Sequence, residues 1–467
     1  GVSPVTPDHV NPEAPWPHLA VLERATSDAG RVLRERLAIG PAFALEPDSW
    51  AAPAIARKVG RSIDARGLPV TDRWHAGAGE EVPSLAAHGR TTETAGIEAL
   101  IAAARSGKRL EEHAIVRLFQ ADGPDVQLLM QAADDLRREV AGDDVTYVVN
   151  RNINYTNICL YKCGFCAFSK GSTKAIRGPA YRLDMEEVGR RAAEAWDRGA
   201  TEVCLQGGIH PDYDGNTYLS VLKAVRDAAP NIHIHAFSPL EVTHGASTLG
   251  LDLEDYMIRL RHAGLATLPG TAAEILDDEI RAIICPDKLN SDEWLNVMRT
   301  AHRVGLRSTA TMMFGHVEGY EHWARHLLKI RDLQEETGGF TEFVPLPFVH
   351  MESPIWTKGR ARSGPSFRET ILMYAIARLV LHPVISNIQA SWVKLGPSGV
   401  AAALRAGVND LGGTLMDESI TRAAGGLNGQ LCDPAQMAQL ALEAGRDAVQ
   451  RTTLYGTLSA PRLEAAE

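Results

Sequence analysis

Three of the six cysteines in this 467-residue chain, Cys159, Cys163 and Cys166, are clustered in a C-x3-C-x2-C arrangement. This spacing puts three thiolates on one loop, where they can bind three irons of a cubane. A 4Fe-4S cluster ordinarily takes four cysteines, so a compact set of three leaves one iron open to a ligand from outside the protein. A structural zinc site would want a fourth Cys or His nearby, and the sequence offers no obvious second pair. Zinc binding and three unrelated core cysteines remain the alternatives.

The rest of the composition is that of a globular protein that works on small molecules. Hydrophobic residues make up 45% and charged residues 23%, and no apolar run is long enough to span a bilayer. The formal charge of −10 disfavours a broad basic face for nucleic acid. Cys204, Cys285 and Cys432 are scattered, and we interpret them as buried small hydrophobic residues. So few cysteines, with no secretory signal, favour a reducing compartment and predict a cytoplasmic protein.

Beyond Asp143 short β-rich runs alternate with amphipathic segments of helical length. Strand and helix alternating about eight times favours parallel strands joined by right-handed crossovers, which close most economically into a (β/α)8 TIM-type barrel. Ligands and catalytic groups of such barrels gather at the carboxyl ends of the strands. The predicted strands are 146–153, 202–206, 232–237, 266–269, 308–314, 340–346, 385–391 and a weaker 408–411, and the predicted helices between them include 186–198, 217–229, 254–263, 292–304 and 322–337.

The proline-rich start and the helical patterns around the barrel predict four regions. Residues 1–92, with a short helix within 19–37, are expected to be the tail of a preceding domain and a linker. Residues 93–143 form an all-helical lead-in with helices near 95–104, 110–119 and 125–140. Residues 144–425 form the barrel, and residues 426–467 form a helical C-terminal extension.

The cysteine loop, with Phe165 before the third cysteine, resembles the radical S-adenosylmethionine (SAM) superfamily. The resemblance implies a 4Fe-4S cluster on Cys159, Cys163 and Cys166 whose open iron is chelated by the amino and carboxylate groups of SAM. It also implies that an electron donor reduces the cluster, which then cleaves SAM to methionine and a 5′-deoxyadenosyl radical. Such a radical needs a dry pocket, which a barrel supplies.

Five further stretches resemble the deazaflavin-forming FO synthases, in the half that joins tyrosine to a ribitylaminouracil. They read YVVNRNINYTNICLYKCGFCAF, TEVCLQGGIHPDY, HIHAFSPLEV, LPGTAAEIL and FTEFVPLPFVHMESPIW. The resemblance covers about residues 94–460 and implies a transferase that breaks the Cα–Cβ bond of L-tyrosine. The 4-hydroxybenzyl fragment then adds to 5-amino-6-(D-ribitylamino)uracil, and 2-iminoacetate, methionine and 5′-deoxyadenosine leave. The alternatives are a futalosine-pathway radical SAM enzyme of menaquinone synthesis and a non-catalytic Fe–S or zinc module.

The first residues, GVSPVTPDHVNPEAPWPHL, resemble the carboxyl-terminal end of the other FO synthase half, which carries its own cysteine triad. No second triad occurs in this sequence. The resemblance therefore implies that the chain is the C-terminal portion of a fused, bifunctional FO synthase, with the other half as its partner.

Candidate cofactor-binding residues follow two of the predicted strands. Gln206, Gly207 and Gly208 close the second strand, where glycine lets backbone approach a ligand, and the resemblance implies that carbonyls here bind the SAM amino group. Glu274 and Arg281 lie two helical turns apart after the fourth strand. Arg281 is a candidate for the SAM carboxylate and Glu274 for its amino or ribose groups. An ordinary turn and solvated helix charges are the alternatives.

The remaining candidates would bind or deprotonate substrate. His210, Glu241 and Glu352 near strand ends are the candidate catalytic residues, with His235 beside them and a structural role as the alternative for each. A polar row near the last two strands is costly in a barrel unless it meets a ligand, and its amide, ammonium and carboxylate groups can bind a uracil edge and a ribityl chain. These candidate substrate-binding residues are Asn387, Gln389, Lys394, Asn409 and Asp410.

Overall fold

The computed structural model describes residues 17–79, 81–87, 89–170 and 179–458. The N-terminal stretch that resembles the end of another domain lies almost entirely outside the described residues. None of the helices in the described ranges is long and apolar enough to cross a membrane.

Parallel strands form the centre of the molecule, as the alternating pattern predicts. One six-stranded sheet runs in the order β2-β3-β4-β5-β6-β7, and β1 pairs with β8 beside it. Single bridges from Phe343 to Ile388 and from Gln389 to Asp410 join β7 to β8. A further bridge from Arg151 on β2 to Met416 after β8 closes the ring of strands into a barrel. The strands are β1 (Val145–Val148), β2 (Asn150–Asn154), β3 (Glu202–Gln206), β4 (His233–Ala236), β5 (Thr267–Leu268), β6 (Arg307–Phe314), β7 (Phe340–Pro347) and β8 (Asp410–Gly413).

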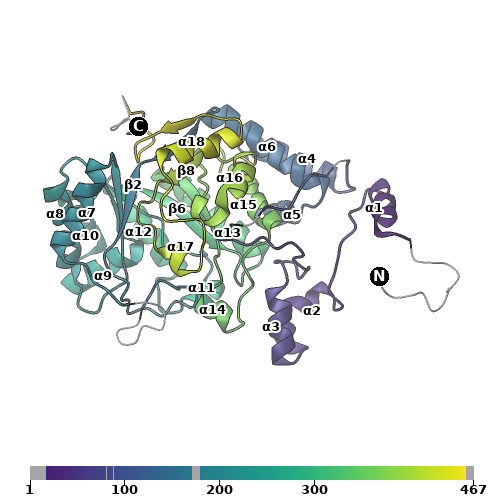
Figure 1. The fold of residues 1–467 in the computed structure, drawn as a ribbon, viewed down its shortest axis with the longest axis horizontal. Coiled ribbons are helices and arrows are strands. Elements are labelled where there is room, and N and C mark those ends of the chain that lie inside the picture. The colour runs from purple at the N-terminus through teal and green to yellow at the C-terminus, as the bar shows by residue number, and fades with distance from the viewer. Residues whose placement is uncertain (1–16, 80, 88, 171–178, 459–467) are drawn as a thin grey trace.

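Helices cover the outside of this ring, and their apolar faces pack on the strands. In Figure 1 the teal helices α7 to α10 cover one side of the barrel, and the green helices α13, α15 and α16 lie on the other. The helices of the barrel are α7 (Met185–Asp197), α8 (Gly215–Ala228), α9 (Pro239–Leu249), α10 (Leu253–His262), α11 (Asp278–Ile284), α12 (Ser291–Arg303), α13 (Tyr320–Thr337), α14 (Pro354–Thr357), α15 (Phe367–Val380), α16 (Trp392–Leu404) and α17 (Ile420–Ala423).

The seventh predicted strand, 385–391, is reduced to the two bridges at Ile388 and Gln389. Here hydrogen bonds from a side chain replace part of the backbone pairing of a strand. The buried guanidinium of Arg378 donates to the carbonyls of Gly407 at 2.8 Å and Ser386 at 2.5 Å. These contacts satisfy backbone groups that a longer strand would pair.

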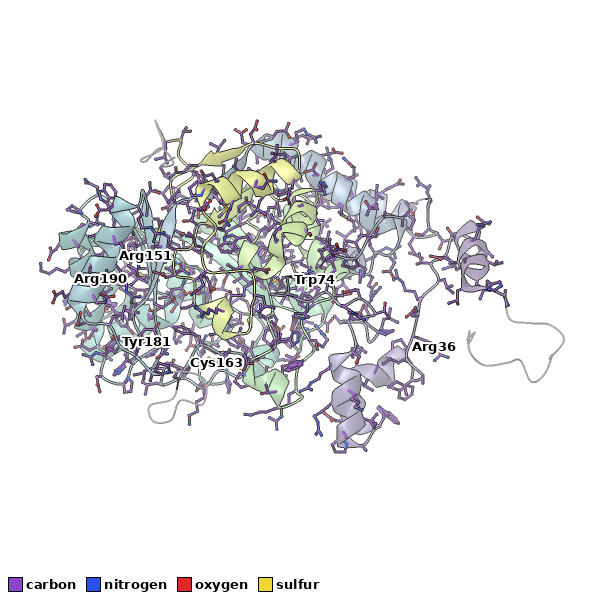
Figure 2. The ribbon with its side chains drawn as sticks, viewed as in Figure 1. Arg36, Trp74, Arg151, Cys163, Tyr181 and Arg190 are labelled. Carbon is purple, nitrogen blue, oxygen red and sulfur yellow. The ribbon has the colours of Figure 1, made fainter. Side chains whose placement is uncertain are left out.

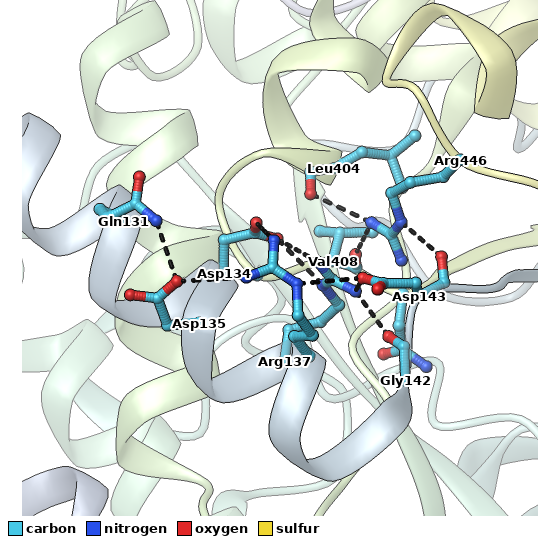
Figure 3. Close-up of polar contacts among 12 residues, drawn as sticks. Gln131, Asp134, Asp135, Arg137, Gly142, Asp143, Leu404, Val408 and Arg446 are labelled. Carbon is cyan, nitrogen blue, oxygen red and sulfur yellow. Dashed lines mark hydrogen bonds and ion pairs between the residues drawn. The ribbon is translucent and has the colours of Figure 1, made fainter.

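The segment before the barrel contains three helices, α4 (Thr94–Arg105), α5 (Glu112–Phe119) and α6 (Pro124–Ala141). Figure 3 shows how the end of α6 is tied to the C-terminal extension. Arg137 donates to Asp143 at 2.9 Å, and Arg446 donates to the carbonyls of Asp143 at 2.9 Å and Val408 at 3.0 Å. The network joins three segments beside the start of β1.

The C-terminal extension is not purely helical, which corrects the prediction for residues 426–467. It contains α18 (Pro434–Glu443) and then β9 (Ala448–Gln450), which pairs in parallel with β1. A strand of three residues is too short for a recognisable period-2 pattern, so no strand was predicted here. After β9, the buried side chain of Arg451 reaches into the barrel.

The N-terminal segment carries α1 (Leu19–Asp28), α2 (Pro41–Leu45) and α3 (Pro53–Arg61), and Figure 1 shows α1 apart from the barrel. The structure differs from the expectation that all residues before 92 lie outside the barrel. Trp74, labelled in Figure 2, is only 3% exposed, and its ring lies 5.1 Å from that of Phe367 on α15. The N–H of Gly77 donates to the carbonyl of Lys394 at 2.7 Å.

Candidate active site

A cavity of about 360 Å³ opens at the carboxyl ends of the barrel strands, and we call it the upper chamber. Cys159, Cys163 and Cys166 all line it, from the loop that follows β2. All three are free thiols. The clustering in sequence is therefore a clustering at the mouth of the barrel, where this fold places its chemistry.

Backbone hydrogen bonds to distant segments fix the cysteine loop. The N–H of Gly164 donates to Ile284 at the end of α11, and the N–H of Ile355 on α14 donates to Gly164, both at 2.7 Å. The N–H of Leu160 donates to Ile209 at 2.8 Å. Cys163, labelled in Figure 2, thus lies on a loop that other parts of the fold hold in place.

The thiols suit a metal cluster rather than a structural role in the core. Backbone N–H groups of Ile209 and Ser169 donate to the sulfurs of Cys159 and Cys166, each at 3.4 Å. Burial raises the pKa of Cys163 to about 12. Thiolates in such a place require a nearby cation, and binding of a metal supplies that charge. Three sulfurs on one loop around a cavity are a donor set for a soft metal.

Two glycines let the end of β3 approach the cysteine loop. A Cβ at Gly208 would lie 2.2 Å from the carbonyl oxygen of Ile158 and 3.0 Å from Cys159. A Cβ at Gly207 would lie 2.4 Å from the ring of Tyr155. With Gln206, both glycines line the upper chamber, so the three predicted cofactor-binding residues are gathered beside the cysteines.

Glu241 also lines the upper chamber, but its carboxylate is fully engaged. It accepts from the N–H of Ser238 at 2.7 Å, from the Ser238 hydroxyl at 2.6 Å, from the N–H of Gly207 at 3.2 Å and from the hydroxyl of Tyr155. Burial raises its pKa, while these donors lower it. The geometry makes Glu241 a positioning residue for the glycine pair.

Glu274 faces the chamber with a partner that the sequence did not reveal. Lys288 donates to its carboxylate at 2.9 Å, and the two side chains are only 11% and 12% exposed. The Lys288 ammonium also lies 5.2 Å from the ring centroid of Phe165. Burial acts to lower the pKa of Lys288, but Glu274 and the nearby thiols outweigh it and raise the pKa. No periodic pattern links positions 274 and 288, so only the fold pairs them.

Three of the predicted catalytic and cofactor-binding residues lie outside the described lining of the upper chamber. The guanidinium of Arg281 donates to backbone carbonyls, including those of Leu289 at 2.8 Å and Ala273 at 2.5 Å. His210 accepts from the N–H of Asp212 at 3.1 Å. Glu352 is exposed, and its N–H donates to Ala424 at 3.1 Å. These hydrogen bonds of Arg281 and His210 are with backbone groups, and that of Glu352 is made by its own backbone.

The predicted substrate-binding row is divided between structure and cavity. The amide of Asn387 donates to the Thr341 carbonyl at 3.0 Å, and Asn409 donates to Asn387 at 3.1 Å. Asp410 is fully buried and accepts two hydrogen bonds from Arg451, at 2.5 and 2.9 Å. The polar groups of these three residues are therefore bound to other parts of the barrel wall. Lys394 lines the upper chamber, where burial lowers its pKa.

Gln389 lines a second cavity, of about 190 Å³, nearer the starts of the strands. We call this cavity the lower chamber. His235 lines it too, as does Cys204, whereas Cys285 and Cys432 are buried as predicted. Three charged groups in its wall, Glu202, Glu342 and Arg451, were missed because they come from β3, β7 and the segment after β9. Only the closed barrel brings such residues together.

Comparison with known proteins agrees with this site. Residues 153–330 match the radical SAM superfamily, and residues 337–463 match the CofH/MqnC C-terminal region. The chain is 43% identical to the FO synthase of Streptomyces avermitilis and 44% identical to that of Mycobacterium leprae, and it spans 59% and 58% of their lengths. It is 50% identical, over 88% of the relative's length, to a 5-amino-6-(D-ribitylamino)uracil–L-tyrosine 4-hydroxyphenyl transferase of Methanopyrus kandleri.

Solved structures share the fold at low identity. Methylornithine synthase superposes with a TM-score of 0.59 at 20% identity, covering 75% of this chain and 97% of that one. The FeFe-hydrogenase maturase HydG from Carboxydothermus hydrogenoformans gives 0.58 at 16%, covering 77% and 81%. With the cysteine triad and glycine pair at the barrel mouth, the sequence matches show that the chain carries a radical SAM domain and belongs to the family of the 5-amino-6-(D-ribitylamino)uracil–L-tyrosine 4-hydroxyphenyl transferases.

Proposed function

We propose that this chain transfers the 4-hydroxybenzyl group of L-tyrosine to 5-amino-6-(D-ribitylamino)uracil, releasing 2-iminoacetate. The observation that carries the proposal is the cysteine triad in a chamber that adjoins a second chamber with buried charged groups in its wall. The name of the half-identical Methanopyrus relative, which this chain covers over 88% of its length, supports the choice of substrates.

The upper chamber fits the two cofactors that the superfamily implies. Cys159, Cys163 and Cys166 would bind a 4Fe-4S cluster, and SAM would lie beside Gly207 and Gly208, where there is no side chain to exclude it. When bound and reduced by an electron donor, the cluster and SAM supply the one-electron chemistry that removes a hydrogen atom from substrate.

The chain's own residues orient the substrates and exclude water. Leu240, Phe348 and Val393 give the upper chamber apolar walls, which protect reactive species from solvent. Lys394 places a buried amine in this wall, opposite in charge to the carboxylate of an amino acid. We propose that Lys394 binds the carboxylate of tyrosine. Glu241 fixes the backbone of Gly207 and so the position of the end of β3.

We propose that the partner is the other FO synthase half, because this chain spans only 58–59% of the length of the relatives named FO synthase. Large apolar side chains are exposed along the N-terminal segment, a surface suited to contact with another domain. They are Leu19, Val21, Leu33, Ile39, Phe43, Leu45, Trp50 and Ile55.

Anaerobic turnover tests the proposal. The reduced, cluster-loaded protein is incubated with SAM, tyrosine and the ribitylaminouracil, and products are identified by mass spectrometry. We expect 5′-deoxyadenosine and a benzylated uracil adduct, with deazaflavin fluorescence only after the other half is added. Cys163→Ala is the inactive control. SAM cleavage only with a futalosine-pathway substrate would overturn the choice of reaction and leave the family assignment intact.

A further inference from the structure

The two chambers of the barrel adjoin at a ring of shared residues, which we call the throat. The polar residues Asn152, Gln206, Thr271, Thr311 and Ser391 line both cavities, as do Leu346 and Leu415. A ligand that occupied both chambers would extend from the cysteine triad toward the starts of the strands. The far end is closed by Arg451, which donates to Asp410 at 2.5 Å and lies 3.3 Å from Glu342.

Charge in the lower chamber disfavours an anionic ligand. Glu202 and Glu342 are both in its wall, and both are at least 93% buried, with exposed fractions of 5% and 7%. The guanidinium of Arg451 is already bound to Asp410 and Glu342. A carboxylate or phosphate entering here would meet two acidic groups and no uncommitted cation among the residues that line it. Such a group belongs in the upper chamber, near Lys394.

An apolar ligand is disfavoured as well. The Oδ1 atom of Asn152 and the Oγ1 atom of Thr271 are buried without a hydrogen-bond partner in the structure. Each such atom costs about 1–3 kcal/mol unless a ligand or water completes it. The chamber's volume of about 190 Å³ is far more than the roughly 15 Å³ that one water needs. These two atoms, which line both chambers, and the carboxylates of Glu202 and Glu342 favour a neutral ligand that carries hydroxyl groups.

We infer that the lower chamber binds the ribityl chain of the acceptor, with the aminouracil ring in the throat and tyrosine in the upper chamber. This inference rests on the proposed function and adds to it the place and orientation of the acceptor. Glu202, Glu342 and the amide of Gln389 accept from hydroxyl groups, and the throat atoms of Asn152 and Thr271 meet the ring or the first carbons of the chain.

Binding measurements separate the chain from the ring. Titration calorimetry under anaerobic conditions compares 5-amino-6-(D-ribitylamino)uracil with 5,6-diaminouracil, which lacks the polyol. We expect the wild type to bind the ribityl compound at least about tenfold more tightly. Gln389→Leu and Thr453→Val each remove a polar group from the lower chamber. Each should weaken the ribityl compound about tenfold and leave diaminouracil unchanged, since one or two hydrogen bonds are lost.

Thr201→Val is the matched control for Thr453→Val. Its hydroxyl is also buried without a hydrogen-bond partner, but it lines neither chamber. This variant should bind both ligands as the wild type does, and melting curves check that all three variants fold. Equal weakening of both uracils, or weakened tyrosine binding in place of uracil binding, would overturn the inference. A wild type that binds neither uracil would instead refute the proposed function itself.

Discussion

Lys288 donates to Glu274 across 2.9 Å inside the wall of the chamber that also contains the three clustered cysteines. The pair joins the loop after β5 to the segment after α11, and Glu274 reaches it with a left-handed backbone, at φ +47°. The ammonium of Lys288 lies close to Phe165 of the cysteine loop. One ion pair therefore connects the predicted SAM-binding carboxylate with the metal-binding loop.

Breaking this pair should destabilise the protein strongly. Lys288→Met leaves the Glu274 carboxylate buried without its cation, which costs about 3–5 kcal/mol of unfolding free energy. Adding Glu274→Gln should recover most of this loss, because no buried charge then remains. Urea unfolding of the two single variants and the double variant measures the coupling.

Lys223→Met is the control for that experiment, because Lys223 and Asp227 form an ion pair whose side chains are 73% and 64% exposed. Exposed pairs contribute about 0–1 kcal/mol. Equal effects of Lys288→Met and Lys223→Met would contradict the assignment of Lys288 as a buried partner.

The glycine pair should be needed for the metal site. Gly208→Ala puts a methyl group 2.2 Å from the Ile158 carbonyl, so the cysteine loop must shift. We expect iron content after anaerobic reconstitution to fall by at least about half and SAM binding to be lost. Gly60→Ala, where a Cβ meets nothing within 4 Å, should retain full iron. A Gly208→Ala protein with normal iron and SAM affinity would show that the close approach is not required.

The cysteines should divide into two groups. Cys159→Ala, Cys163→Ala and Cys166→Ala each remove a thiol from the upper chamber and should abolish the broad cluster absorbance and SAM cleavage. Cys285→Ala and Cys432→Ala change buried residues that line neither chamber, and Cys204→Ala changes a wall of the lower chamber. These three should retain iron, and a loss of iron in any of them would refute the three-ligand site.

Local patterns predicted the parts of the site that follow one strand, and missed those that several strands build together. The cysteine loop and Gln206 to Gly208 lie in single stretches, and both are in the upper chamber. Asn387 and Asn409 were predicted to bind substrate as polar residues of the last two strands, yet the amide of Asn409 donates to Asn387 at 3.1 Å. Arg451 could not be foreseen, because only the short pairing of β9 with β1 brings it into the barrel. The periodicity of a sequence does not show whether a polar side chain binds a ligand or another side chain.

Stability should depend on pH through Glu342. Burial raises its pKa from 4.5 to about 7, with Asp410 adding to the rise and Arg451 opposing it. Between these two values the folded protein binds a proton that the unfolded chain does not, so the free energy of unfolding falls as pH rises through this window. The loss amounts to about 3 kcal/mol.

Glu342→Gln removes that proton. Urea unfolding at pH 5 and pH 8 should show the variant gaining stability relative to the wild type as pH rises. Glu23→Gln on α1, remote from the barrel, should show no such trend. A constant difference between Glu342→Gln and wild type would mean that Glu342 is ionised throughout.

The final prediction concerns the N-terminal segment, of which only the second part packs against the barrel. Deletion of residues 1–52 removes α1 and α2 together with large apolar side chains, such as Phe43 and Trp50, that are exposed in the intact protein. Folding and iron content should be unchanged. Deletion of residues 1–91 also removes the buried Trp74 and the Gly77 hydrogen bond to Lys394.

Loss of one large buried aromatic side chain costs about 3–5 kcal/mol, so the longer deletion should lower the melting temperature by several degrees. Because Gly77 fixes the backbone beside the Lys394 side chain, the longer deletion should also weaken tyrosine binding. Thermal melts and titration with tyrosine measure both effects. If the protein lacking residues 1–91 melted and bound tyrosine as the wild type does, residues 53–91 would be an attachment to the barrel and no part of its site.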